Sequence, residues 1–329
     1  MGPQLAPVSL AAIQEPVRDD LDRVFSELGR IIAAEFPLID DVNRHLLRIR
    51  GKMFRPTLLL LAAQATGGMR DRMVTLGAVV ELIHLATLIH DDSVDHSALR
   101  RGQPTVNALF THEIAVIMGD YLYSRAVVEL VRLNDLEPLR VMSRVTNEMT
   151  VGEMREITAH DVLSFSQDDY DRLIDAKTAS LMSGACEVGT LDADPAFREP
   201  LKRFGRNLGM AFQIVDDLLD YTGSEDVTGK PAGLDLREHK ITLPLIDALP
   251  LMSDAEQQVV RDLMADPAPS DSAIAEVVDI VRERGGIESA RVRAQEFAGL
   301  AEADLASLPA GKARECLRDC ISYVVERQS

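Results

Sequence analysis

The sequence predicts an all-α protein on three grounds. Apolar residues recur at the i, i+3, i+4 and i+7 spacing of a helix face, as they do at Leu21, Val24 and Leu28. The segment 74–90 is apolar almost all round, which is typical of a helix surrounded by other helices. No strictly alternating run of apolar and polar residues is bounded by hairpin turns, so we expect no sheet.

The elements follow in order along the chain. Residues 1–16 carry three prolines and no periodicity, so we expect a mobile tail ahead of one helical domain over 17–329. Prolines and glycines between the periodic segments divide that domain into about a dozen helices. Ser253 and Glu256 have the spacing of a capping box, and Ser270 begins a further helix.

Composition excludes several classes of function. The 329 residues carry 53 acidic and 35 basic side chains, a formal net charge of −18, which argues against a nucleic-acid partner. Cys186, Cys316 and Cys320 are too few and too scattered for a disulfide framework or a zinc site. We find no secretory signal and no apolar run near the ~20 residues of a membrane helix. We therefore expect a cytoplasmic protein without stable membrane insertion.

The pattern D-D-x-x-D occurs twice, at residues 91–95 and 216–220, and each copy lies at the end of a predicted apolar helix. Residues four apart share a helix face, so the first and last aspartates of each copy project together and repel. Oxygen-only ligands of this kind suit Mg²⁺. A solvated helix end would explain one such pattern in so acidic a chain, whereas two copies favour metal binding.

Cations that could meet a polyphosphate occur in tight local groups, although each alone also fits an exposed surface residue. They are Lys52 with Arg55, Arg100 with Arg101, Lys177 with Thr178, and the pair Lys230 and Lys240. His84 lies two turns before Asp91 on the same helix face, and Gln213 lies three residues before Asp216. Each of these two either contacts a substrate or is a satisfied core residue.

Taken together and in this order, the motifs resemble the trans-isoprenyl diphosphate synthases, the polyprenyl synthetase family. The resemblance runs from about residue 20 to 250 and rests on residues 51–56 (GKMFRP), 81–84 (ELIH), 91–95 (DDSVD), 100–105 (RRGQPT), 119–122 (GDYL), 177–178 (KT), 212–220 (FQIVDDLLD) and 229–231 (GKP). It implies an orthogonal helical bundle around a central apolar cavity, assembled as a homodimer. The chain departs from the family's commoner residues at Glu156, Leu234 and His239, which leaves the aspartates untouched.

The resemblance also implies an activity, in which an allylic diphosphate is elongated by head-to-tail condensation with isopentenyl diphosphate. It assigns about three Mg²⁺ ions per active site to Asp91, Asp95, Asp216 and Asp220. It assigns catalytic roles to Asp91, Asp95, Asp216, Lys177 and Lys230. It places the allylic diphosphate on Arg100, Lys177, Thr178, Gln213, Lys230 and Lys240, and isopentenyl diphosphate on Lys52, Arg55, His84 and Arg101.

Product length is expected to depend on Ala86 and Thr87, which lie four or five residues before Asp91. By family resemblance, small side chains there go with long all-trans products, about C30 or beyond. The same small residues could instead let two helices approach closely. A shorter-chain farnesyl or geranylgeranyl diphosphate synthase, a terpene cyclase, a subunit that needs a partner and a plain helical scaffold remain the alternatives.

Overall fold

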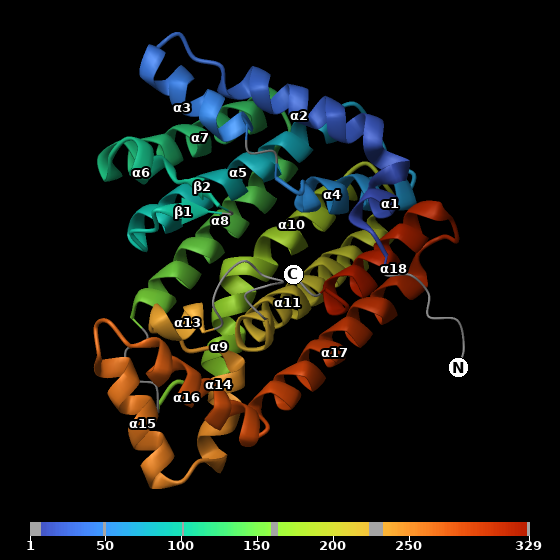
Figure 1. The fold of residues 1–329 in the computed structure, drawn as a ribbon. Coiled ribbons are helices and arrows are strands. Elements are labelled where there is room, and N and C mark those ends of the chain that lie inside the picture. Colours follow the sequence, from blue (N-terminus) through green and yellow to red (C-terminus); the bar gives the residue numbers. More distant parts are fainter. Residues whose placement is uncertain (1–7, 49–50, 101, 159–163, 224–232, 328–329) are drawn as a thin grey trace.

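The computed structural model describes residues 8–48, 51–100, 102–158, 164–223 and 233–327. Most of these residues are helical, which confirms the all-α prediction (Figure 1). One short hairpin was not expected: β1 (Leu99–Arg100) pairs antiparallel with β2 (Gln103–Pro104). Gly102 allows the tight turn between them because its backbone adopts a positive φ of 72°.

The helices of the first half of the chain are joined mostly by short turns. Their bounds are α1 (Leu10–Gln14), η1 (Glu15–Val17), α2 (Arg18–Ile32), α3 (Pro37–Arg48), α4 (Phe54–Ala65), α5 (Arg72–Val94), α6 (Val106–Leu109), α7 (His112–Arg132), α8 (Leu136–Ile157) and α9 (Gln167–Ile174). The second half continues with η2 (Asp175–Ala179), α10 (Ser180–Gly189), η3 (Pro195–Phe197), α11 (Arg198–Thr222), α13 (Leu234–Arg237), α14 (Leu243–Ala248), η4 (Leu249–Leu251), α15 (Asp254–Ala265), α16 (Asp271–Glu283), α17 (Gly286–Asp304), η5 (Leu305–Ser307) and α18 (Lys312–Val325).

Helix α5 is enclosed by other helices, which explains why its sequence has no polar stripe. It packs against α2, α4 and α7, and also touches α8 and α10. We expected no apolar segment of membrane-spanning length, yet α5 meets that test by length and composition alone. Because 67% of its apolar window is buried inside the protein, these features are those of a core helix.

Helix α11 connects two hydrophobic clusters. Phe204 and Leu208 in its first half belong to the cluster that also contains residues of α4, α5, α8 and α10. Ile214 and Leu218 in its second half belong to the cluster that also contains residues of α9 and of α14 to α17. Figure 1 shows α13 to α16 gathered at the end of the molecule away from α2 and α3. The aspartate pattern at the end of α11 therefore lies where these two clusters meet.

Two helix starts confirm the capping signals in the sequence. Ser253 caps α15 by a capping box, in which its backbone N–H donates to the Glu256 carboxylate at 2.7 Å. The Ser270 hydroxyl caps α16 by accepting from the Ala273 N–H at 3.2 Å.

The structure differs from expectation near the N-terminus. Helix α1 lies within the segment 1–16, which we expected to be a mobile tail. Ile13 is fully buried and α1 packs against α18. A helix of five residues is too short to show a periodic pattern, so the sequence carried no signal for it. The assignment of residues 17–329 to one domain stays a prediction.

Candidate active site

Asp91 and Asp95 lie one turn apart at the C-terminal end of α5. The Asp95 N–H still donates to the Asp91 carbonyl at 2.8 Å, so the two side chains keep the register of one helix face. Burial raises the pKa of Asp91 to about 7, Lys177 opposes this shift, and the charges of Glu153 and Asp95 add to it. The Asp91 carboxylate is therefore an anion that a nearby cation would strongly stabilise.

Asp92, the middle member of the first pattern, holds a cation in place. Its side chain is buried, and it accepts a hydrogen bond from the Arg100 guanidinium at 2.8 Å. Burial raises the pKa of Asp92, and Arg100 opposes that shift. Arg100 is thereby fixed on the β1 hairpin beside the end of α5, where its charge also acts on Asp91.

Lys177 and Thr178 lie in η2, a single turn of π-helix. Helix α8 approaches this turn closely, because a Cβ added at Gly152 would lie 2.8 Å from the backbone nitrogen of Lys177. Only glycine allows this approach without a shift of one of the two segments. The close packing brings the acidic residues of α8 next to the Lys177 side chain.

The Lys177 ammonium pairs with two carboxylates of α8. Its Nζ lies 2.8 Å from the Glu153 carboxylate and also forms an ion pair with Glu156. Burial alone would lower the pKa of Lys177, but Glu156, Asp91 and Glu153 outweigh it and keep that pKa above its usual value. Lys177 is therefore a firmly held cation directly beside the first aspartate pattern.

The second pattern lies in the last turns of α11, and its members also differ in role. Asp217 is buried and accepts hydrogen bonds from the Tyr170 hydroxyl at 2.6 Å and from the Gln213 amide at 2.8 Å. Burial raises the pKa of Asp217 to about 7 in spite of these two donors. Asp216 is half exposed and forms an ion pair with Arg327, just beyond α18.

Asp220, the last member, anchors the start of α13. Its two carboxylate oxygens accept from the backbone N–H groups of Leu234 and Asp235, each at 3.0 Å. The residue predicted as a metal ligand thus already has two backbone donors. It fixes the helix that precedes Lys240.

Two connections bring the two aspartate patterns to one place. The Thr178 hydroxyl donates to the Gln213 side chain at 2.8 Å, so the residue next to Lys177 contacts α11. The Lys240 ammonium, which follows α13, lies 3.7 Å from the Asp95 carboxylate and 2.7 Å from Glu238. Cations are therefore placed between the two sets of acids, where a polyanion could replace the present partners.

The predicted isopentenyl diphosphate group is brought together in part. The Arg55 guanidinium lies 3.0 Å from the Nε2 atom of His84, across α4 and α5. Lys52 is exposed, and its carbonyl accepts from the Gln14 amide at 2.9 Å. Arg101, like Lys230 of the other group, lies outside the described residues.

Aromatic contacts connect this second group to α11. Phe54 stacks on Phe212 with ring centroids 6.2 Å apart, and the Arg327 guanidinium lies 4.7 Å from the centre of the Phe212 ring. Arg327 was missed in the sequence because a lone arginine near a chain end shows no motif. Its pairing with Asp216 depends on the docking of α18, which no local pattern reports.

A cavity of about 510 Å³ opens beside Asp91. Ala86 and Thr87, the predicted chain-length residues, both line it, and Ala86 is only 3% exposed. The full lining is Ile83, Ala86, Thr87, His90, Asp91, Asp120, Tyr123, Ser143, Thr146, Asn147, Met149, Thr150, Glu153 and Lys177. The cavity therefore lies between α5, α7 and α8, and its α8 wall carries more hydroxyl and amide groups than the apolar lining we expected.

The carboxylates fit a hard divalent cation by their chemistry. The acids that face this region supply only oxygen atoms, and the raised pKa of Asp91 shows that the anion lacks full compensation. No group of three or more Asp, Glu, His or Cys side chains within the described ranges is gathered closely enough to form a preassembled metal site. Asp91, Asp95, Asp216 and Asp220 therefore stay the predicted ligands of a metal ion.

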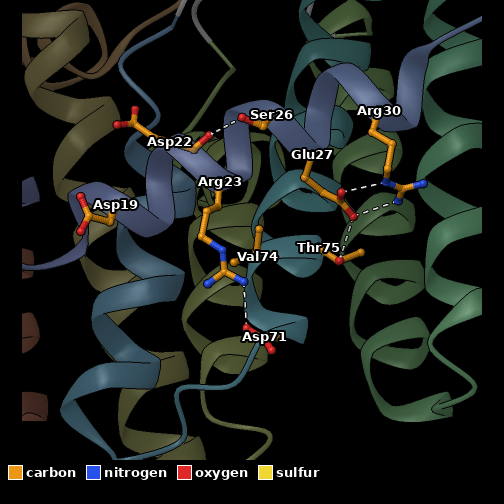
Figure 2. Close-up of a pocket in the computed structure, with 9 residues that line it drawn as sticks. All are labelled: Asp19, Asp22, Arg23, Ser26, Glu27, Arg30, Asp71, Val74 and Thr75. Atoms are coloured by element: carbon orange, nitrogen blue, oxygen red, sulfur yellow. Dashed lines mark hydrogen bonds and ion pairs between the residues drawn. The ribbon is translucent and has the colours of Figure 1, made fainter.

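A second hollow lies at the other end of α5 and is a charged surface feature. Figure 2 shows it between α2 and the start of α5, with Arg23 directed at Asp71 and Arg30 paired with Glu27. Its lining residue Thr75 is 16 positions before Asp91, roughly 24 Å along a helix that rises 1.5 Å per residue. The Arg23–Asp71 pair joins α2 to the start of α5, whereas the Arg30–Glu27 pair lies within α2. Neither pair takes part in the candidate active site.

Comparison with known proteins places the chain in a family. Residues 35–281 match the polyprenyl synthetase family. The chain is 36% identical to an all-trans-nonaprenyl-diphosphate synthase (geranyl-diphosphate specific) of Rhodobacter capsulatus, over 96% of this chain and 97% of that protein. It is 35% identical to solanesyl diphosphate synthase 2, chloroplastic, of Arabidopsis thaliana, over 98% of this chain and 78% of the relative.

Solved structures agree with this match. A polyprenyl synthase from Caulobacter crescentus, complexed with calcium and isoprenyl diphosphate, superposes with a TM-score of 0.93 at 32% identity, over 99% of this chain and 100% of the other. A decaprenyl diphosphate synthase from Rhodobacter capsulatus gives 0.92 at 35% identity, over 98% and 100%. With two aspartate patterns, paired cations and an adjoining cavity in one place, the chain belongs to the polyprenyl synthetase family.

Proposed function

We propose that this prenyltransferase elongates an allylic diphosphate with isopentenyl diphosphate and releases a long-chain all-trans polyprenyl diphosphate. The cavity carries this proposal, because it begins at Asp91 and passes Ala86 and Thr87. A polyanion held at Lys177 would place its hydrocarbon tail in that cavity. The relatives support a long product, because they are named solanesyl, nonaprenyl and decaprenyl diphosphate synthases.

The proposed allylic diphosphate site lies between the two aspartate patterns. Lys177, Arg100 and Lys240 would turn from their present carboxylate partners to the diphosphate oxygens, with Thr178, Gln213 and Lys230 completing the site. About three Mg²⁺ ions, bound by the aspartates, would neutralise the charge that develops on the leaving diphosphate. The isopentenyl diphosphate would bind to Lys52, Arg55, His84 and Arg101, where the Arg55–His84 contact already holds two side chains together.

The chemistry requires no protein nucleophile. The allylic C–O bond breaks, diphosphate leaves with the bonding electrons, and a delocalised carbocation remains. The double bond of isopentenyl diphosphate attacks this cation, and loss of a proton gives an allylic diphosphate longer by five carbons. Ile83, Ala86 and Met149, which are buried, exclude water that would quench the cation.

We further propose that the protein is a cytoplasmic homodimer that binds neither nucleic acid nor, stably, a membrane. Helix α7 supports the dimer, because Val116, Ile117, Val128 and Val131 are large apolar side chains exposed to solvent. A second copy of this face would cover them. The net charge of −18 supports the absence of a nucleic-acid partner.

The decisive experiment supplies purified protein with Mg²⁺, farnesyl diphosphate and isopentenyl diphosphate, and measures product length by chromatography. Products of about C30 or longer are expected by the analogy of fold and family. A C20 product only would replace the long-chain proposal by a short-chain one, and so would C15 formed from geranyl diphosphate without elongation of farnesyl diphosphate. Hydrocarbons formed without isopentenyl diphosphate would identify a cyclase, and a product only after addition of a second protein would identify a dependent subunit.

A further inference from the structure

One lysine of the proposed diphosphate site is paired with Glu156 of α8. Glu156 forms an ion pair with Lys177, and its charge also raises the pKa of Lys240. Lys240 lies on the opposite side of the site, 3.7 Å from Asp95. Glu153, three residues earlier on α8, differs because it lines the cavity and acts on Asp91.

The charges around the lysines are unbalanced. Glu153 and Glu156 both form ion pairs with Lys177, and the charge of Asp91 also acts on it, so the negative charge around this one ammonium group exceeds its own charge. A diphosphate that approaches Lys177 must displace at least one of these ion pairs. The Glu156 side chain is about one-quarter exposed and its contact with Lys177 is only partly screened by water.

We propose that Glu156 sets the affinity of the site for the allylic diphosphate, because it competes with the diphosphate for Lys177. This inference rests on the proposed function of the same site. Glu156 acts through Lys177 and is a positioning residue. Its negative charge weakens binding of the substrate and of the released inorganic diphosphate, and this favours product release after each elongation step.

Replacing Glu156 by glutamine removes the charge and keeps the size of the side chain. Binding of farnesyl thiodiphosphate, a slowly reacting analogue, is measured by calorimetry with saturating Mg²⁺. The dissociation constant of Glu156→Gln is expected to fall about tenfold, since a hydrogen bond to a charged group contributes ~1.5 kcal/mol and more. The KM for isopentenyl diphosphate should stay unchanged, because Arg55 and His84 lie in the other group.

Two controls distinguish competition between Glu156 and the diphosphate from a general effect of removing a negative charge from α8. Glu148→Gln makes the same chemical change on the same helix, at a carboxylate paired with Arg144 at 3.1 Å, and should leave the affinity unchanged. In a Lys177→Gln background, the substitution at Glu156 should lose most of its effect, because the shared lysine is gone.

Equal or weaker analogue binding by Glu156→Gln would overturn this inference, since a glutamate that merely holds Lys177 in place predicts weaker binding. An effect that persists in full without Lys177 would overturn it as well. If the wild-type protein binds the analogue and elongates farnesyl diphosphate, these failures leave the proposed function intact. Absence of analogue binding by the wild-type protein would instead overturn both.

Discussion

Replacing Ala86 by phenylalanine should shorten the product sharply. Ala86 lies five residues before Asp91, roughly 7.5 Å further down a helix with a rise of 1.5 Å per residue. An extended chain advances roughly 1.2 Å per bond, so an isoprene unit with four main-chain bonds spans about 5 Å. The ring would therefore meet the tail of an allylic substrate that is one to two units long. Since each condensation adds one more unit, elongation should stop near C10 to C15.

The assay incubates the variant with farnesyl or geranyl diphosphate and labelled isopentenyl diphosphate, and separates the dephosphorylated products by reversed-phase chromatography. Ala86→Ser is the matched control, because it changes the same position without filling the cavity. Circular dichroism and thermal melting establish that the variant is folded, since overpacking costs about 1–3 kcal/mol. A folded, active Ala86→Phe protein with products of unchanged length would refute the assignment of this cavity to the growing chain.

Three other predictions concern charge and packing. Burial raises the pKa values of Asp91 and Asp217 to about 7, so the folded protein binds protons that the unfolded chain has released. The free energy of unfolding without metal should therefore fall as pH rises from 5.5 to 7.5, by up to ~1.4 kcal/mol per pH unit for each group. The measurement is a series of urea titrations with EDTA at different pH values. In the same titrations, Asp91→Asn should flatten the slope of this free energy against pH. A slope of the opposite sign would contradict the burial argument. Gly152→Ala places a Cβ 2.8 Å from the backbone nitrogen of Lys177. We expect the free energy of unfolding to fall by about 1–3 kcal/mol and diphosphate binding to weaken. An unchanged free energy of unfolding together with unchanged binding would show that α8 and η2 separate freely. In steady-state kinetics, Arg55→Gln should raise the KM for isopentenyl diphosphate at least about tenfold and leave the KM for the allylic substrate unchanged. An equal rise in the two KM values would contradict separate sites for the two substrates.

Local patterns in the sequence were sufficient for the elements of the fold. The helical spacing around Leu21 and Val24, the all-apolar segment 74–90 and the serine caps act within a few turns of one helix, so neighbours in sequence are neighbours in space. The same holds inside each D-D-x-x-D pattern, whose spacing directly sets which aspartates share a helix face. The short helix α1 and the β1–β2 hairpin are the exceptions, because segments of five and two residues are too short to show a period.

The sequence by itself determined the helical class, the two acidic patterns and the residue types of the site. Only the tertiary structure decided which cation meets which acid: Arg100 lies on Asp92, Lys240 beside Asp95, and Arg327 on Asp216. Asp95 and Lys240, the partners furthest apart in the sequence, are separated by 145 positions. Such contacts depend on how α5, α11 and α18 pack. The π-helical turn at Lys177 lies against Gly152 of α8, and this close approach likewise became visible only in the tertiary structure, because the two residues belong to different helical segments.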